Sequence, residues 1–351
     1  MTVLIRFRWV VAAVLGALAG VVTRTTPPDA ADFARFAGLL LHGRFAEVYA
    51  DPWNQAGPAQ LLICRLLMAG AQADGTPALG VAALVGAALV AGAMWLCRDH
   101  LHREVLAGGL ALIWVASPLP WNGHPAELAV PLLWAYAIKL SRLSSRRGDL
   151  AAAAVLALGV AIAPWAILGV PCLLAGAPLW RAVRTGIVAV ALGVAGYLPF
   201  VLTGHFAMFR LHWGISAGTL PSLLGVTDVT WATRLVQGAM VAGGVALIAR
   251  HCRPDPRAVA IVPLAAGLLR VATDPVYYTY YWFPVAVASV LLIAVDRRRP
   301  LIAVALGYLV LLAESGNWIV WGSLGALGLL LVSAGKSRAS GATFPAVVAT
   351  R

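Results

Sequence analysis

The chain has 351 residues, of which 61% are hydrophobic and 11% are charged. A soluble domain is about one quarter charged, so the composition excludes an ordinary soluble enzyme. Inside lipid only helices or closed barrels satisfy the backbone, and the apolar runs here are continuous rather than alternating, which favours helices. The net charge of +12 fits basic cytoplasmic loops and does not by itself indicate nucleic-acid binding. We therefore expect an all-α polytopic membrane protein.

A membrane span needs about 20 predominantly apolar residues. About twelve transmembrane helices are predicted, over residues 8–23, 77–97, 104–118, 125–140, 150–163, 164–180, 187–203, 231–249, 258–273, 276–295, 301–314 and 317–335. Two of these spans meet at Ala163–Pro164, so a tight external turn must join them. Residues 1–335 are expected to form a single transmembrane domain, followed by a short disordered cytoplasmic tail over residues 336–351.

The charged residues predict the orientation of the helices. Arg6 and Arg8 precede the first apolar run, which we interpret as an uncleaved transmembrane helix rather than a signal peptide. The segment LLICRLLMAG (residues 61–70) is short and contains Arg65, and an arginine at a span centre costs about 2.5–3.5 kcal/mol. It is therefore interpreted as an external re-entrant or interfacial helix. Both termini are then cytoplasmic, most Lys and Arg residues lie inside, and residues 24–76 and 204–230 form two external loops.

The first external loop contains two aspartates at the start of a predicted helix. The sequence TTPPD (residues 25–29) is typical of a helix start, and the apolar residues from Asp29 to Gly43 predict an amphipathic helix on the outer surface. A carboxylate at a helix N-terminus prefers to stay ionised, which suits a general base. Asp29 and Asp32 are the candidates. The alternative is that Asp29 only caps the helix and that Asp32 only pairs with Arg35.

The same loop also carries a spacing pattern. It reads Asp29, Phe33, Leu39-Leu40-Leu41, Gly43 and Tyr49, and is followed by NGHPAE (residues 122–127), a basic loop (141–147), an Ala-rich segment (151–164) and a Pro-containing segment (165–180). Over a little more than half of its length the chain resembles polyprenyl-phosphate-sugar-dependent glycosyltransferases of the GT-C superfamily, most of all the mannosyltransferase-like glycosyltransferase family 87. Two positions depart from that pattern. His124 and Glu127 replace a Gln and an Asn, and Ala163-Pro164 replaces Lys-Pro.

The resemblance implies an inverting transfer of mannose or another sugar on the extracytoplasmic side of the plasma membrane. The donor would be a polyprenyl-phosphate-linked sugar and the acceptor a lipid or glycan, with membrane lipids but no nucleic acid as further partners. By its position in the motif Asp29 would be the base, with Asp32 as the other candidate. The resemblance implies no metal and no cofactor.

Further polar residues near the predicted outer helix ends are candidates for substrate binding. The donor phosphate would be bound by Arg210, His212 and Arg270, and the substrate by His124, Glu127, Asp274, Tyr277 and Tyr278. His124 and Glu127 are three residues apart, so they share a helix face and could bind sugar hydroxyls, although alone they do not make a metal site. The alternatives are snorkelling of Arg210, an interfacial histidine at 212 and an interfacial aromatic belt over residues 277–283.

Two other classes of function stay open on the sequence alone. A transporter or flippase for a lipid or solute would place charged pairs or broken helices at the membrane midplane, where the predicted spans are poor in charge. No inverted repeat is recognisable. A noncatalytic membrane partner in envelope assembly is the third hypothesis, and the two departures from the family pattern keep it open.

Overall fold

The computed structural model describes residues 2–26, 29–116, 124–210, 213–253 and 255–296. Most of this part of the chain is helical, which confirms the all-α fold, and its only strand-like pairing is an isolated bridge between Gly214 and Asp228. The helices, in chain order, are α1 (Thr2–Val22), α2 (Ala30–Leu41), α3 (Phe45–Val48), α4 (Pro58–Leu67), α5 (Leu79–Leu96), α6 (Leu101–Ala116), α7 (Ala126–Ser141), α8 (Arg146–Ile162), the 3₁₀ helix η2 (Pro164–Ala175), α9 (Leu179–Ala195), α10 (Leu198–Val201), α11 (Leu220–Leu223), α12 (Trp231–His251), α13 (Ala258–Thr273), the 3₁₀ helix η3 (Thr279–Trp282) and α14 (Phe283–Val295).

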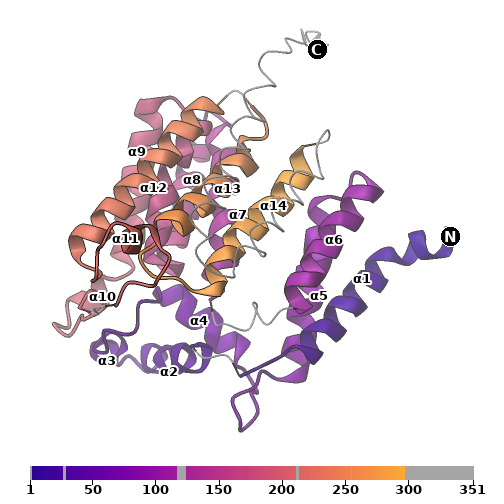
Figure 1. Ribbon diagram of the computed structural model, residues 1–351, viewed down its shortest axis with the longest axis horizontal. Helices are drawn as coiled ribbons and strands as arrows, with labels where there is room; N and C mark the ends of the chain where they lie inside the picture. The colour runs from indigo at the N-terminus through magenta and orange to yellow at the C-terminus, as the bar shows by residue number, and fades with distance from the viewer. Residues whose placement is uncertain (1, 27–28, 117–123, 211–212, 254, 297–351) are drawn as a thin grey trace.

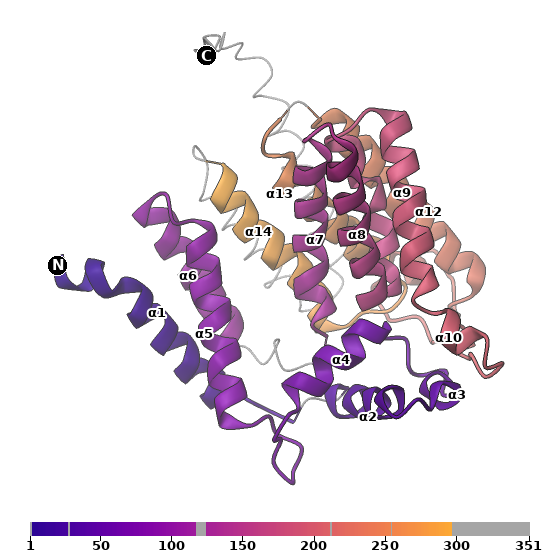
Figure 2. The ribbon, with the colours of Figure 1, turned by 180° about the vertical axis from the view of Figure 1, so that it is seen from behind.

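The helices form two groups, and the short helices α2 to α4 lie across one end of the larger group. Helices α1, α5 and α6 stand together on one side, and α7, α8, α9, α12, α13 and α14 form the larger bundle (Figure 1). Helix α14 contacts both groups, because it packs against α6 and α5 as well as α7 and α13. Helices α2, α3 and α4 lie across the end of the bundle where α7 begins (Figure 2).

Helices α1 and α5 pack through glycines. A Cβ atom added to Gly86 would lie 2.1 Å from the carbonyl oxygen of Gly16, and one added to Gly20 would lie 2.4 Å from that of Ala82. The two backbones are therefore in direct contact. Close approach at small residues is the usual way in which apolar helices associate where water supplies no hydrophobic driving force.

The chain turns sharply between α8 and η2, as the sequence predicts. Ala163 is extended (φ −148°, ψ 129°), because the residue before a proline is disfavoured in the helical region, and Pro164 opens η2. The segment predicted as a span over 164–180 is a 3₁₀ helix to Ala175, with Pro171 inside it. Gly169 lets η2 approach Trp134 of α7, whose Nε1–H donates to the carbonyl of Ala166 at 3.1 Å.

The helix bounds agree with only part of the predicted membrane topology. Within the described residues, Leu79–Leu96 and Trp231–His251 are long and apolar enough to cross a membrane. Shorter apolar helices cover Phe7–Val22, Pro58–Leu67, Pro164–Ala175, Ala258–Thr273 and Tyr280–Val295. Twelve spans are therefore not confirmed. The predicted spans 301–314 and 317–335 and the tail 336–351 lie outside the described residues.

Helices α2 to α4 are held against the bundle by specific contacts. The helix predicted from Asp29 is present as α2, which buries Phe33 and Phe36 and ends before Gly43, whose φ is +73°. Tyr49 is buried, and burial raises the pKa of its phenol, which donates to the carbonyl of Ala56 at 2.9 Å. Next to it, the amide of Gly57 donates to the carbonyl oxygen of Ile162 at the end of α8, at 3.0 Å.

Candidate functional site

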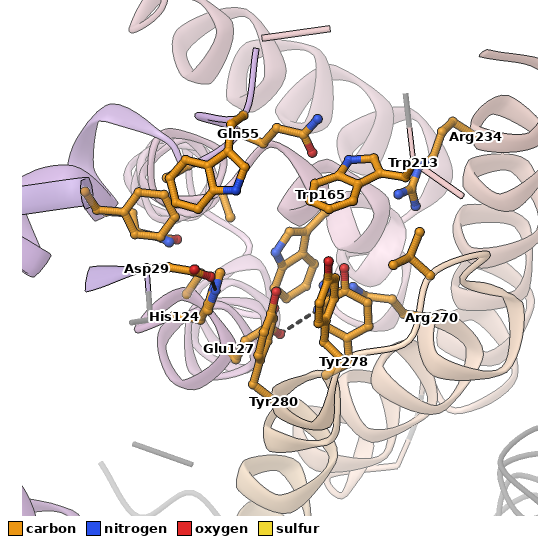
Figure 3. A pocket seen from close by; sticks show the side chains of 18 residues that line it. Asp29, Gln55, His124, Glu127, Trp165, Trp213, Arg234, Arg270, Tyr278 and Tyr280 are labelled. Carbon is orange, nitrogen blue, oxygen red and sulfur yellow. Dashed lines mark hydrogen bonds and ion pairs between the residues drawn. The ribbon is translucent and has the colours of Figure 1, made fainter. Parts of the chain in front are cut away.

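A cavity of about 230 Å³ lies where the starts of α2 and α7 meet the α8–η2 turn and η3 (Figure 3). Its walls combine carboxylates, arginines, glutamine amides and several aromatic rings. These side chains come from segments that are far apart in the sequence, so the cavity exists only when α2 to α4 are docked on the bundle.

One wall carries a pair formed by an aspartate and a histidine. Asp29 precedes α2, but its carboxylate makes no hydrogen bond to the amides of that helix. Instead its Oδ2 atom lies 2.7 Å from Nε2 of His124, just before α7. The imidazole stacks on Tyr280, with ring centroids 3.9 Å apart, and meets the ring of Phe33 edge-on at 5.7 Å. These contacts fix the direction in which the histidine faces Asp29.

Asp32 lies outside the cavity, on the exposed side of α2. Its side chain is 50% exposed, and its nearest charged partner is Arg35, whose Nη2 atom lies 3.5 Å from Oδ1. Asp32 does not line the cavity. The two aspartates that the sequence left as alternatives therefore have different surroundings: Asp29 lines the cavity and contacts a histidine, whereas Asp32 faces solvent beside an arginine.

A buried ion pair forms the floor of the cavity. Nη1 of Arg270, from α13, donates to Oε2 of Glu127, from α7, at 2.5 Å, and both side chains are at least nine-tenths buried. The guanidinium carbon lies 3.8 Å from the ring centroid of Trp165 and 4.3 Å from that of Tyr281. Desolvation of such a pair is costly, and close geometry together with cation–π contact offsets that cost.

Arg234 is a second cation at the cavity, and sequence reasoning did not single it out. It lies in the first turn of α12, and its Nη1 atom donates to Oδ1 of Asp274 at 3.1 Å and to Oε1 of Gln237 at 2.8 Å. Thr230 and Thr233 form a capping box that fixes the start of α12, so Arg234 lies in the first turn of that helix.

A second cavity of about 360 Å³ adjoins the first and shares part of its wall, including Trp165, Arg234 and Arg270. The rest of its lining is mostly apolar, with Leu168 and Phe209 among the contributors. A charged cavity thus continues into an apolar one past the same two arginines. That arrangement suits a ligand with an anionic group between a polar part and an apolar part.

The structure brings together some of the residues predicted to form the site and separates others. Asp29, His124, Glu127, Arg270 and Tyr278 line the first cavity, and Asp274 lines the second. Arg210 is exposed and lines neither cavity, and the hydroxyl of Tyr277 accepts from the indole N–H of Trp282 at 3.4 Å, away from both. His212 lies outside the described residues. Cavity residues that the sequence analysis did not select include Trp53, Gln55, Gln60, Trp165, Trp213, Arg234, Tyr280 and Tyr281.

Within the described part of the chain, no three His, Cys, Asp or Glu side chains gather in a way that could hold a metal ion. Comparisons with protein-family models, with curated proteins and with solved structures found no match to this chain.

Proposed function

We propose that the chain is a multi-pass plasma-membrane glycosyltransferase that moves a sugar from a polyprenyl-phosphate donor to a hydroxyl of a lipid or glycan acceptor, with inversion. The observation that carries the proposal is the shared cavity of Asp29 and the two arginines, Arg234 and Arg270. A base and an anion-binding group must face one reaction centre in such a transfer, and the first cavity contains both.

The membrane topology of the proposal rests on the charge distribution. Helices α2 to α4 and the cavity lie at one end of the bundle, whereas the loops at the other end are short and rich in arginine, as at 142–147. Basic loops stay cytoplasmic. The cavity then faces the extracytoplasmic side, where α2 lies along the outer interface as an amphipathic helix.

The reaction requires a base for the acceptor. In the proposed step Asp29 takes the proton of the acceptor hydroxyl while the oxygen attacks the anomeric carbon of the donor sugar. The bond between that carbon and the phosphate oxygen breaks, and polyprenyl phosphate leaves with the bonding electron pair. Attack from the face opposite the leaving group inverts the configuration. His124 acts as a positioning residue, because its 2.7 Å hydrogen bond turns the carboxylate of Asp29 away from the helix amides.

The leaving phosphate requires positive charge. Arg234 and Arg270 are each held by a carboxylate, Asp274 and Glu127 respectively, so both guanidinium groups are oriented before a substrate binds. Each guanidinium has five N–H donors, and the carboxylate contacts leave some of them for phosphate oxygens. Preorganised donors stabilise developing charge without reorganisation during the reaction.

The rest of the lining suits a lipid-linked sugar. Trp53, Trp165 and Trp213 offer flat apolar faces for a sugar ring, and Gln55 and Gln60 offer amide groups for its hydroxyls. The apolar second cavity, on the far side of the arginines, has room for the first isoprene units of the lipid. The order polar, cationic, apolar along the two cavities matches the order sugar, phosphate, lipid in the proposed donor.

The decisive experiment compares Asp29→Asn with Asp32→Asn in proteoliposomes, using radiolabelled polyprenyl-phosphomannose or polyprenyl-phosphoarabinose and an envelope lipid extract as acceptor. Loss of a general base is expected to lower transfer about 10²–10⁴-fold in the Asp29 variant. The Asp32 variant is the matched control and should keep wild-type transfer. Unchanged transfer in the Asp29 variant would refute its assignment as the base. Uptake of donor without any transfer by the wild-type protein would instead indicate a transporter.

A further inference from the structure

The opposite end of the bundle contains a basic cavity that the proposed transfer does not use. It has a volume of about 510 Å³ and lies between the first turn of α8 and the first turns of α9. Arg146, Arg181 and Arg184 line it, together with the single carboxylate Asp149. Three guanidinium groups around one carboxylate leave the cavity with a net positive charge.

Asp149 organises this cavity. Its side chain is 9% exposed and accepts from Nη2 of Arg181 at 2.8 Å, from Nε of Arg181 at 3.2–3.3 Å and from Nη2 of Arg184 at 3.5 Å. Nη2 of Arg181 also donates to the carbonyl of Ser141 at 2.8 Å, which ties α9 to the end of α7. Arg181 is therefore held rigidly at the wall, whereas Arg184 is 57% exposed and reaches the rim.

Arg146 completes the rim from the other side. It is exposed, lines the cavity and makes no hydrogen bond or ion pair with any side chain that the structure describes. It is also the first residue of α8, a helix of 17 residues capped by Ser145, which accepts from the amide of Gly148 at 3.0 Å. The first amides of a helix add partial positive charge to that of the arginines.

The floor of the cavity is apolar. Leu150, Ala153 and Val188 line it, and Leu192, one turn beyond Val188 on α9, continues it as an apolar residue that is 54% exposed. A basic rim above an apolar, lipid-facing groove matches a molecule with an anionic head and a hydrocarbon chain. Free phosphate would contact only the arginines of the rim.

We propose that this cavity binds the phosphate of an anionic phospholipid of the cytoplasmic leaflet, with the acyl chain lying in the groove between α8 and α9. Basic pockets between helices on the cytoplasmic side commonly bind anionic head groups, and each Lys or Arg adds about 1 kcal/mol of attraction near such a surface. The proposal does not depend on what the cavity at the other end does.

The test titrates the purified full-length chain in detergent with dioleoylphosphatidylglycerol, and separately with dioleoylphosphatidylcholine, and counts bound lipids by native mass spectrometry. The wild-type protein should retain one phosphatidylglycerol in preference to phosphatidylcholine. The double variant R146Q/R184Q should bind phosphatidylglycerol roughly tenfold to thirtyfold more weakly. Both substituted residues are exposed, so this variant should remain folded.

The matched control is R98Q/R250Q, which removes two exposed arginines at the same end of the bundle, outside the cavity. It should bind phosphatidylglycerol like the wild-type protein. Three results would each overturn the proposal. The control could lose as much phosphatidylglycerol affinity as R146Q/R184Q, R146Q/R184Q could keep wild-type affinity, or the wild-type protein could bind phosphatidylcholine as well as phosphatidylglycerol. Millimolar inorganic phosphate should leave the bound lipid in place. Displacement by phosphate would show that the rim takes free phosphate and that the assignment to a lipid is wrong.

Discussion

Nε2 of His124 lies 2.7 Å from Oδ2 of Asp29, although 95 positions separate the two residues in the chain. This contact joins the start of α2, which lies across the end of the bundle, to the start of α7. It also gives the aspartate a partner other than the helix that follows it. Asp29 therefore faces a cavity instead of capping α2.

The first prediction concerns the role of His124 in positioning Asp29. His124→Ala removes the hydrogen bond, and a displaced base is expected to lower kcat by up to about 10²-fold with little change in KM. His124→Gln retains an N–H donor and should recover part of the loss, which a purely structural role would not produce. The exposed His100 provides the control, because His100→Ala should leave transfer unchanged. Parallel changes in KM and kcat would contradict a positioning role.

The second prediction concerns the buried pair of Glu127 and Arg270. Glu127→Gln leaves the guanidinium buried without its counter-charge, which typically costs about 3–5 kcal/mol of unfolding free energy. Arg44 and Glu47 form the matched surface pair, with side chains 57% and 48% exposed. Glu47→Gln should therefore have little effect on stability. Unfolding titrations in mixed micelles measure the loss of unfolding free energy in both variants. Equal losses would show that the pair of Glu127 and Arg270 is solvated.

The third prediction concerns the seam between α4 and α8. A Cβ atom on Gly57 would lie 2.2 Å from the carbonyl oxygen of Ala161, so Gly57→Ala must push α4 off the bundle. We expect lower thermal stability, faster proteolysis between α3 and α4, and loss of transfer. Gly38, inside α2, has no atom within 4 Å of an added Cβ, and Gly38→Ala should stabilise the protein by about 0.5–1 kcal/mol. Similar melting temperatures for the two variants would argue against this seam.

The fourth prediction concerns the thiol of Cys64 on α4. Burial, and secondarily the charge of Asp29, raise its pKa to about 12, compared with about 8.5 for a free thiol. Because only the thiolate reacts, labelling of Cys64 by N-ethylmaleimide in detergent should stay slow at pH 8. Leu66 is 72% exposed on the same helix, so Leu66→Cys should react quickly at pH 8. Rapid labelling of Cys64 at pH 8 would show that α4 is not packed as described.

The sequence predicts the helices well where a long apolar run ends in turn residues. The bounds of α13 coincide with the predicted segment 258–273, and the turn at Ala163–Pro164 follows from the proline alone. Helix α9 begins earlier than expected, at Leu179. The predicted span begins at residue 187, whereas the helix already includes Arg181 and Arg184, which pair with Asp149 across the α8–α9 contact. Charge patterning alone therefore does not fix where a helix begins.

The site is less accessible to sequence reasoning, because its contacts join distant segments. Asp29 and Asp32 have similar local patterns, and residues three apart share a helix face, so their spacing does not separate them. The contact of Asp29 with His124, its place in the cavity lining and the exposure of Asp32 distinguish them in the structure. The pairing of Glu127 with Arg270 was equally hidden, since each residue alone was interpreted as a substrate contact. The catalytic assignment and the family resemblance stay predictions.

The two rings around Arg270 restrict the directions from which a ligand can approach it. The rings of Trp165 and Tyr281 pack against the guanidinium group, and Glu127 accepts from its Nη1 atom. An incoming oxygen can therefore reach only the N–H groups that these contacts leave open. The arginine thus selects for the orientation of an anion as well as for its charge, a discrimination that the rotatable ammonium group of a lysine could not provide.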